Sequence, residues 1–162
     1  MPSSTRRLLL LAGAAVLGGC GFQPRRAPEM AFRSIALQGF APRSPLADAL
    51  KRQLAKTVQV LDNPQQAEVV LQATTDRREK SVVASTSAAQ VREFQLRMKF
   101  DFRAHTPAGK ALIAPVELLL SRGMSYSEAA ALAKEQEEAE LYREMQSDIV
   151  AQVLRRLAAI RL

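Results

Sequence analysis

The clearest pattern of hydrophobic and polar positions lies in residues 94–103, where apolar side chains alternate with polar, mostly basic ones. Successive side chains of a strand point to opposite faces, so this alternation predicts a β-strand with one buried face and one wet face. A Pro/Gly turn at residues 105–109 follows, and residues 110–121 supply the partner strand of an antiparallel hairpin. The expected inward positions are Phe94, Leu96, Met98, Phe100 and Phe102 on the first strand and Val116, Leu118 and Leu120 on the second.

Two further segments, residues 32–38 and 67–75, are short and rich in apolar and β-branched residues, and both predict strands. The polar segment 76–90 forms either a long hairpin connection or a frayed extension of two strands. Residues 58–61 are interpreted as an approach to the turn at 62–64.

Helical periodicity occurs twice in the chain. In the first instance Leu46, Leu50 and Leu54 fall on one face of a helix. Ser44 suits the N-cap of this helix and Pro45 suits its first position.

The second helical pattern starts at Ser127, a good N-cap, with Ser125 and Glu128 as a competing capping box. Residues 134–140 are almost wholly polar, so we expect the first half of this helix to protrude past the sheet while the second half packs on it. The apolar stripe consists of Leu141, Met145, Ile149, Val153 and Leu157, widened by Val150, Leu154 and Ile160.

The element order is therefore β-α-β-β-β-α. It predicts an α+β fold: a two-layer sandwich with a mostly antiparallel sheet of about four strands and two helices on one face.

The N-terminal residues have the pattern of an export signal. Arg6 and Arg7 precede an apolar run at residues 8–17, which is too short for a transmembrane span. The sequence LGGC that ends at Cys20 resembles the bacterial lipobox, which implies cleavage before Cys20 and its conversion to an N-palmitoyl, S-diacylglycerol cysteine. The alternative is an ordinary signal peptide with an incidental cysteine, but Cys20 is the only cysteine in the chain. Gly21 replaces the Asp that retains lipoproteins in the inner membrane, which favours a lipid-anchored protein on the periplasmic side of the outer membrane.

We therefore expect three parts: a lipoprotein signal peptide at 1–19, a lipidated tether at 20–30, and one α/β domain at 31–162. The chain carries a formal charge of +7, and loss of Arg6 and Arg7 with the signal leaves +5. This charge suits anionic lipid head groups or an acidic partner, although it could equally serve solubility alone. With no Trp and two Tyr, the chain offers few rings for base stacking, and we expect no nucleic-acid partner.

Candidate catalytic residues are few. His105 is the only histidine and lies in the Pro/Gly turn. The chain has no G-x-S-x-G motif, no phosphate-binding glycine loop and no His/Cys/Asp cluster with metal-ligand spacing. We expect neither an enzyme nor a metal or other cofactor.

Binding residues are better supported. Three cations, Arg77, Arg78 and Lys80, cluster after the second strand, and Lys134 stands near the start of the last helix. Arg and Lys side chains gathered in this way suit a phosphorylated ligand. A second set of cations alternates along the wet face of the third strand, where a solvated face is the favoured interpretation. These residues are Arg97, Lys99 and Arg103.

Three groups of segments remain to be interpreted together. They are the opening Cys20-Gly21-Phe22 with Arg25, the strand start Phe94-Gln95-Leu96, and the helix segments Ala131-Leu132-Ala133-Lys134-Glu135, Leu141-Tyr142-Arg143-Glu144-Met145 and Leu154-Arg155-Arg156-Leu157. Together these segments resemble the LptE family of lipopolysaccharide-assembly lipoproteins, and the resemblance extends over nearly all of the chain after the signal.

The resemblance implies a domain that sits in the lumen of the outer-membrane β-barrel LptD, helps to assemble it and binds lipopolysaccharide. Lys134 best matches a ligand-contacting position. The family tends to have a basic residue in the loop before the alternating strand, but residues 81–90 contain none, so Arg77, Arg78, Lys80 or Arg92 would have to serve. The alternative is a free outer-membrane lipoprotein that activates a cell-wall synthase or assists a lipid-transport ATPase.

Overall fold

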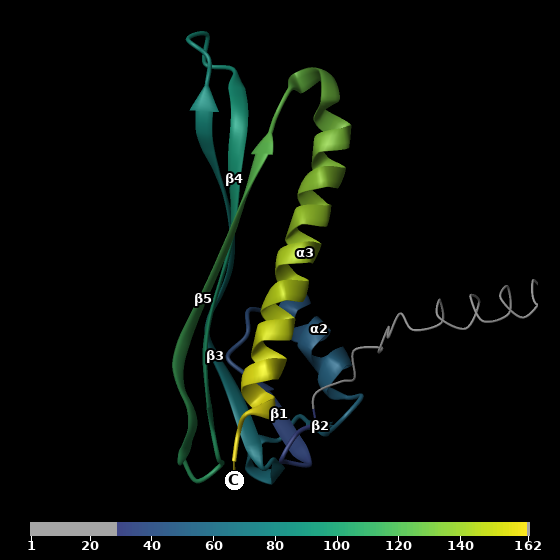
Figure 1. The fold of residues 1–162 in the computed structure, drawn as a ribbon, viewed down its shortest axis with the longest axis vertical. Helices are drawn as coiled ribbons and strands as arrows, with labels where there is room; N and C mark the ends of the chain where they lie inside the picture. Colours follow the sequence, from purple (N-terminus) through teal and green to yellow (C-terminus); the bar gives the residue numbers. More distant parts are fainter. Residues whose placement is uncertain (1–28, 162) are drawn as a thin grey trace, which may run out of the picture.

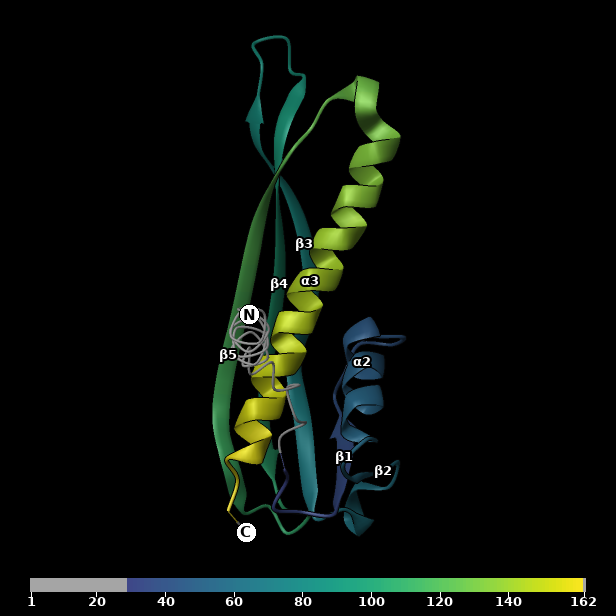
Figure 2. The ribbon, with the colours of Figure 1, turned by 45° about the vertical axis from the view of Figure 1, so that its right-hand side comes forward.

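The computed structural model describes residues 29–161, which form one five-stranded sheet with both helices on one face (Figures 1 and 2). The strand order is β2-β1-β3-β4-β5. The α+β two-layer class is confirmed, with one strand more than expected. The strands are β1 Ser34–Gln38, β2 Gln59–Leu61, β3 Val69–Ser85, β4 Val91–His105 and β5 Ala111–Ser125; the α-helices are α2 Pro45–Leu54 and α3 Ala131–Ala158, and 3₁₀ turns span Pro64–Gln66 and Glu128–Ala130.

The additional strand is β2, which pairs in parallel with β1. It is three residues long, so no alternation could reveal it before the turn at 62–64. Its pairing follows from the crossover through α2, which returns the chain alongside β1. Strand β1 also runs parallel to β3, whereas β3, β4 and β5 form an antiparallel meander.

The meander strands are much longer than the rest of the sheet. Strand β3 has 17 residues, and only its first part, Val69–Gln72, pairs with β1. The polar segment after residue 75 is thus a strand extension, and the connection to β4 spans only residues 86–90. We call residues 77–99 and 119–144 the distal half, which lies at the top of Figure 1, and the remainder the proximal half.

Helix α3 follows the extended strands closely, so the expectation that its first half protrudes past the sheet is wrong. At 28 residues it is about 42 Å long, and the long strands reach further still. Lys80 on β3 contacts Glu138 of the helix, and Ser125 at the end of β5 contacts Lys134. Figure 2 shows the first half of α3 beside the upper part of the meander.

The α3 start also differs from expectation. Ser127 has an extended backbone but makes no side-chain cap bond, and a 3₁₀ turn precedes the first α-helical residue, Ala131. Ser125 accepts a hydrogen bond from Lys134 in place of the expected capping-box bond. The cap of α2 is confirmed, because Ser44 Oγ accepts from the Ala47 amide at 3.1 Å.

The core lies between the proximal sheet and the helices. Phe100 stacks against Phe102 at 5.3 Å and against Phe40 at 5.6 Å between ring centroids. The expected inward residues of β4 from Leu96 to Phe102 are buried, as is Leu118 of β5. The helices supply fully or nearly fully buried Leu46, Leu50 and Leu54 from α2 and Met145, Ile149, Val150, Val153 and Leu157 from α3.

A bulge in β3 decides which side chains of its distal part face the helices. The register to β4 skips one residue between Ala73 and Thr75, and Thr74 donates its hydroxyl to the Asp101 carbonyl. Gly39, with φ +75°, lies against this bulge, and a Cβ there would stand 2.1 Å from the Ala73 carbonyl oxygen. A glycine is required at this position.

The signal peptide, Cys20 and most of the tether lie outside the described residues; Met30, at the tether's end, packs against the core. Among residues 29–161, no helix combines the length and apolar character needed to cross a bilayer.

Candidate functional site

The register of β3 separates the cations that the sequence placed together. Lys80 lies opposite Leu96 and Arg78 opposite Met98, so both face α3. Arg77 lies opposite Lys99 and faces the other side of the sheet. Beyond Gln72, the outer edge of β3 pairs with no described strand. Arg77 and Arg78 therefore lie on opposite faces of the sheet beside this unpaired edge.

The α3 side of the distal half contains a small cavity of about 110 Å³. Lys80 from β3 and Lys134 from the first turn of α3 both line it, although 54 positions separate them in the sequence (134 − 80). This structure therefore brings together two of the five cations predicted to bind the ligand. The lining residues are Lys80, Phe94, Met124, Tyr126, Ala131, Lys134, Glu135 and Glu138.

Lys80 is held from two directions. Its Nζ lies 2.6 Å from Glu138 Oε2 on α3 and 4.2 Å from the centre of the Phe94 ring. A cation over the face of an aromatic ring is attracted by the ring quadrupole. The ammonium group is thus fixed at the wall of the cavity.

Lys134 is the more shielded of the two, with 19% of its side chain exposed. Its Nζ donates to Ser125 Oγ at 3.0 Å and lies 2.7 Å from Glu137 Oε2. The first bond ties the start of α3 to the end of β5, and the second is formed within the helix one turn further on.

Two aromatic rings form the apolar wall of the cavity. Phe94 and Tyr126 meet edge to face, with centroids 5.2 Å apart and planes at 75°. The Tyr126 amide donates to the Arg92 carbonyl at 2.8 Å, which holds the segment after β5 against β4. Arg92 itself is exposed and its side chain reaches Gln90 at 3.5 Å.

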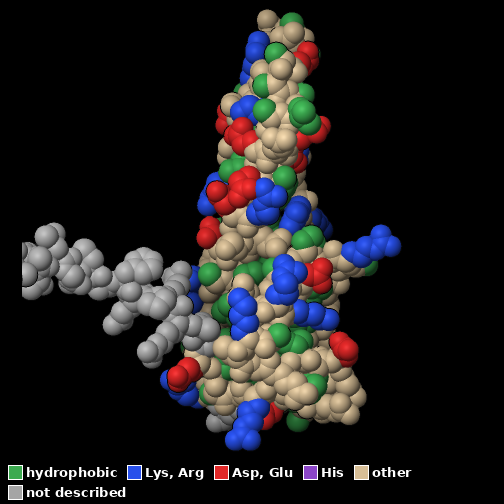
Figure 3. All heavy atoms as spheres, turned by 90° about the vertical axis from the view of Figure 1, so that its right-hand side faces the viewer, with side chains coloured by type: hydrophobic (Ala, Val, Ile, Leu, Met, Phe, Trp, Pro, Cys, Tyr) green, Lys and Arg blue, Asp and Glu red, His purple; other side chains and the backbone are tan. Residues whose placement is uncertain are grey.

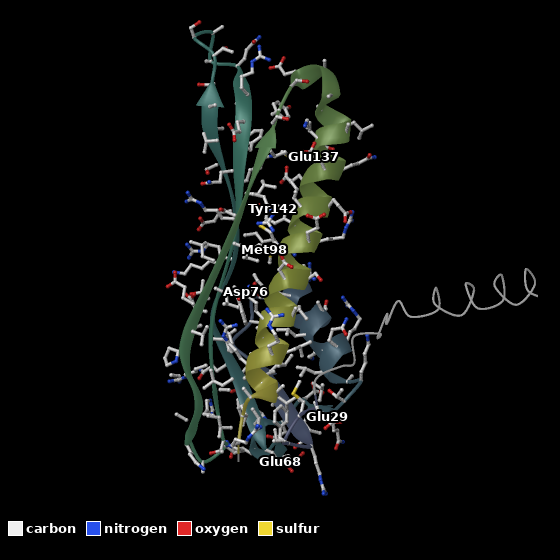
Figure 4. The ribbon with its side chains drawn as sticks, in the orientation of Figure 1. Glu29, Glu68, Asp76, Met98, Glu137 and Tyr142 are labelled. Atoms are coloured by element: carbon white, nitrogen blue, oxygen red, sulfur yellow. The ribbon has the colours of Figure 1, made fainter. Side chains whose placement is uncertain are left out.

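Arg78 belongs to a neighbouring polar contact lower on α3. Its guanidinium donates to Gln146 Oε1 at 2.6 Å and lies 5.2 Å from the Tyr142 ring centre. The Tyr142 hydroxyl donates to the Glu79 carbonyl at 2.7 Å. Burial raises the pKa of Tyr142 above its usual value, and the negative charge of Glu138 adds to this effect. Figure 4 shows Glu137 near the top of α3 and Tyr142 lower, between the helix and the strands.

The basic residues on the opposite face of the sheet are engaged with their neighbours. Lys99 lies 3.5 Å from Asp101 and 3.4 Å from Glu117. A hydrogen bond to Glu117 and the charge of Asp101 raise the pKa of Lys99. Arg103 donates to Gln72 at 2.9 Å, and Arg97 contacts Gln95. This arrangement agrees with a solvated strand face.

A larger cavity of about 360 Å³ lies at the proximal end, between β5 and the end of α3. It offers one charged group, Arg156, whose Nη1 donates to the Gln152 carbonyl. His105 lies near this end, with Nδ1 2.8 Å from the Thr106 carbonyl. Within residues 29–161 no three His, Cys, Asp or Glu side chains gather as a metal site would require. The convergent charged groups are therefore in the distal cavity.

On the helix side, acidic and basic side chains are interspersed, with no broad area of one sign (Figure 3). Charge alone would not locate the site. Sequence reasoning missed Phe94 as a site wall, Tyr126 and Glu138. A signal existed for Glu138, because it follows Lys134 by four positions and such residues share a helix face.

Comparison with known proteins supports the same family as the sequence motifs. A family model described as "LptE: Lipopolysaccharide-assembly" matches residues 32–157. The protein named LPS-assembly lipoprotein LptE from Yersinia enterocolitica is 27% identical over 161 residues, which cover 96% of this chain and 77% of that protein.

Solved structures of lipoproteins share the fold. Lipoprotein B from Nitrosomonas europaea matches with a TM-score of 0.72 and 28% identity, covering 86% of this chain and 91% of that one. The minor lipoprotein from Acinetobacter baumannii has a TM-score of 0.64 at 22% identity, covering 80% and 93%. The rare lipoprotein B from Shewanella oneidensis has a TM-score of 0.63 at 23% identity, covering 78% and 95%. The last two similarities concern the fold alone. Since the family model covers well over half of the 162 residues, the chain belongs to the LptE family of lipopolysaccharide-assembly proteins.

Proposed function

We propose that this chain is an outer-membrane lipoprotein that binds lipopolysaccharide at the distal cavity and assembles with an LptD-like β-barrel. Family membership supports the role in lipopolysaccharide assembly. The observation that carries the binding role is that Lys80 and Lys134 line one cavity beside two aromatic rings. Ammonium groups suit the phosphates of lipopolysaccharide, and the rings suit the apolar part next to them. The role is binding and assembly, without catalysis.

The five candidate cations take different roles in this proposal. Lys134 and Lys80 contact the phosphate directly, because both are at the cavity wall. Arg78 lies on the same face beside Tyr142, and the Arg92 carbonyl accepts a hydrogen bond from the Tyr126 amide. Both residues therefore flank the site. Arg77 would contribute only around the free edge of β3.

The binding role is tested by charge reversal. Lys134→Asp and Lys80→Asp should each weaken lipopolysaccharide binding by about tenfold or more, because a hydrogen bond to a charged group contributes roughly 1.5–3 kcal/mol. Arg77→Asp makes the same charge change on the opposite face and should weaken binding less than about threefold. Circular dichroism checks that each variant is folded. Undiminished binding by a folded Lys80→Asp/Lys134→Asp double variant would reject this site.

The barrel partner is tested in outer membranes solubilised in detergent. The lipoprotein should co-purify with the LptD-like barrel, and its depletion should stop lipopolysaccharide from reaching the cell surface. A lipoprotein that migrates alone while the barrel matures normally would contradict the proposal. Normal lipopolysaccharide export after depletion would favour the free accessory lipoprotein instead.

The lipid anchor rests on Cys20 and its lipobox. At about 0.8 kcal/mol per buried CH₂, two or three acyl chains retain a protein on a bilayer durably, whereas one is marginal. Mass spectrometry of the mature protein should give a triacylated Cys20 as the first residue. An unmodified Cys20, or a mature protein that still carries residues 1–19, would contradict the proposed lipid anchor.

A further inference from the structure

The distal end of the molecule lacks charge over two segments that are far apart in the sequence. Residues 81–91, which span the hairpin between β3 and β4, contain no charged side chain, and residues 129–133 consist of four alanines and Leu132. The hairpin and the start of α3 lie at the same end of the molecule in both ribbon views (Figures 1 and 2). In a chain with 24% charged residues, this end is distinct from the charged surface below it.

Large apolar side chains are also exposed at this end. Of the residues that the structure describes, four large hydrophobic ones are exposed, and three belong here: Val82 at 52%, Val83 at 51% and Leu132 at 72%. The fourth, Leu119, lies opposite Lys99 on the face of the sheet away from the helices. We call Val82, Val83 and Leu132 the apolar tip. Exposed apolar side chains that gather at one place mark ligand or interaction sites, whereas single ones are ordinary.

The apolar tip borders the distal cavity on its β3 side and on its α3 side. Val82 lies opposite Phe94, a wall residue of the cavity, and follows Lys80 by two positions, about 7 Å along the same face of β3. Leu132 directly follows Ala131, another lining residue. The cations of the cavity and the exposed apolar side chains therefore form one amphipathic surface along the axis of the molecule.

We propose that the apolar tip binds the acyl chains of the lipid whose phosphate is held at the distal cavity; this inference rests on the proposed function and extends its site. In a phosphorylated lipid the acyl chains begin within a few bonds of the phosphate, so a phosphate beside Lys80 places them next to Val82. Contact between an acyl chain and these side chains removes apolar surface of both from water, which is favourable in proportion to the area.

The composition of this end favours a lipid over a protein partner. Protein interfaces are enriched in aromatic residues, Met and Arg, and they are depleted in Ser and Ala. Residues 81–91 contain three Ser, three Ala and three Val, but no aromatic residue, Met or Arg. Acyl chains require neither hydrogen bonds nor charges from the surface that binds them, and small uncharged side chains suit this requirement.

A purely structural role for these side chains makes a different prediction. Val is favoured in strands because its branched side chain packs well on the pleated surface, and Leu is a good helix former. Thr is also β-branched and Gln also favours helices, so Val82→Thr, Val83→Thr and Leu132→Gln remove apolar surface but keep the local preferences. If the three residues serve only the strand and the helix, these substitutions leave ligand affinity unchanged.

The test compares the full wild-type chain with the triple variant Val82→Thr/Val83→Thr/Leu132→Gln and with the matched control Leu119→Gln. Leu119 is 57% exposed, so the control removes a comparable apolar side chain outside the tip. Each protein is titrated in the same non-ionic detergent with lipopolysaccharide, and with the same lipopolysaccharide after alkaline hydrolysis has removed all its acyl chains. The ratio of the two affinities is the readout, because the detergent and the lipid anchor are common to all three proteins.

The triple variant should lose about 5- to 20-fold in affinity for intact lipopolysaccharide, since three partly exposed apolar side chains leave the contact. Its affinity for the deacylated form should equal that of the wild type, and Leu119→Gln should change neither affinity. Equal wild-type affinities for the two ligands, or a triple variant with the wild-type ratio, would overturn the inference. A loss in Leu119→Gln as large as that in the triple variant would overturn it too.

The outcome is separable from that of the proposed function. A Lys80→Asp/Lys134→Asp variant should bind both ligands more weakly, because both ligands carry the phosphates. If this variant weakens both and the triple variant weakens neither, the phosphate site stands and the acyl contact is wrong. If this variant binds the deacylated form normally, the phosphate site itself is wrong. A triple variant that keeps the wild-type ratio but no longer co-purifies with the LptD-like barrel would assign the tip to a protein contact.

Discussion

The proximal and distal halves of the molecule share one helix and three strands but are held together differently. In the proximal half, α3 packs through fully buried Met145, Ile149 and Val153. In the distal half the same helix meets the sheet through Lys134, Glu138 and, through its hydroxyl, Tyr142. The distal members of the apolar core are Leu96, Met98 and Met124.

The energetic consequence is a gradient of stability along the helix. Full burial of a large apolar side chain contributes about 1.5–3 kcal/mol, whereas an exposed ion pair contributes about 0–1 kcal/mol. More of the buried apolar contacts of α3 lie in the proximal half, so the first half of the helix contributes less to the stability of the fold. Regions with few buried apolar contacts are also those that open locally.

The largest effect on stability is expected from a substitution that creates a cavity in the proximal core. Phe100→Ala removes a fully buried ring that stacks on Phe40 and Phe102, and should lower the free energy of unfolding by about 3–5 kcal/mol. Val82→Ala, at a distal position with 52% exposure, should change it by less than about 0.5 kcal/mol. Urea unfolding measures both, and similar losses in the two variants would contradict the assignment of stability to the buried apolar side chains.

The next largest effect concerns backbone packing near the β3 bulge. Gly39→Ala would force a Cβ to within 2.1 Å of the Ala73 carbonyl and strain φ +75°, so a loss of about 3 kcal/mol or more is expected. Gly109→Ala has φ +87° but open space around it, and should lose only about 1–2 kcal/mol from strain. Thermal unfolding of the pair separates the two contributions. Equal losses of stability in the two variants would mean that the backbone at the β3 bulge shifts to accommodate the Cβ at residue 39.

A smaller effect is expected at the boundary between the halves. Tyr142→Phe removes the bond to the Glu79 carbonyl and should lower stability by about 0.5–1.5 kcal/mol at neutral pH. Burial raises the pKa of Tyr142 in the folded state, so the folded protein holds this proton more tightly than the unfolded chain does. Stability should therefore fall as the pH rises above about 10, the ordinary tyrosine value.

Tyrosinate absorbance provides the check, since the chain has two tyrosines and the variant retains only Tyr126. The difference between the wild-type and variant titrations should give a midpoint above that of a free tyrosine. A stability that declines with alkaline pH equally in both proteins would assign the decline to other groups.

The smallest effect is expected at the ion pair of the distal cavity. A double-mutant cycle of Lys80→Met and Glu138→Gln should give a coupling in the free energy of unfolding of at most about 1 kcal/mol, because 36% and 24% of the two side chains are exposed. Denaturant midpoints of the four proteins suffice. A coupling well above this value would make the pair part of the folding core.

Sequence patterns predicted those parts of the fold that depend on local periodicity. The alternation at residues 94–103 identified β4, and Ser44 with Pro45 identified the start of α2. Strand β2 was missed because its partner, β1, is brought to it by a helical crossover and not by a turn.

The site was predicted only in part. Lys80 and Lys134 were both candidates, but their meeting depends on the length of β3 and on the tilt of α3 along it. Neighbouring residues of a regular strand face opposite sides, so the sequence could separate Arg77 from Arg78 only if residues 76–80 were taken as a strand and not as a loop. Which of them faces α3 depends on the skipped residue after Ala73, since an unbroken register would turn Arg77 inward.

The run of five charged residues at 76–80 lies on a strand whose outer backbone edge is free within the described part of the chain. Such an edge would otherwise recruit a strand from another molecule, and charged side chains along it oppose self-association because pairing would remove them from water. Neutralising this run should therefore promote aggregation of the isolated domain, quite apart from any ligand. The charges of this run thus also disfavour pairing of the free β3 edge with a strand of another molecule.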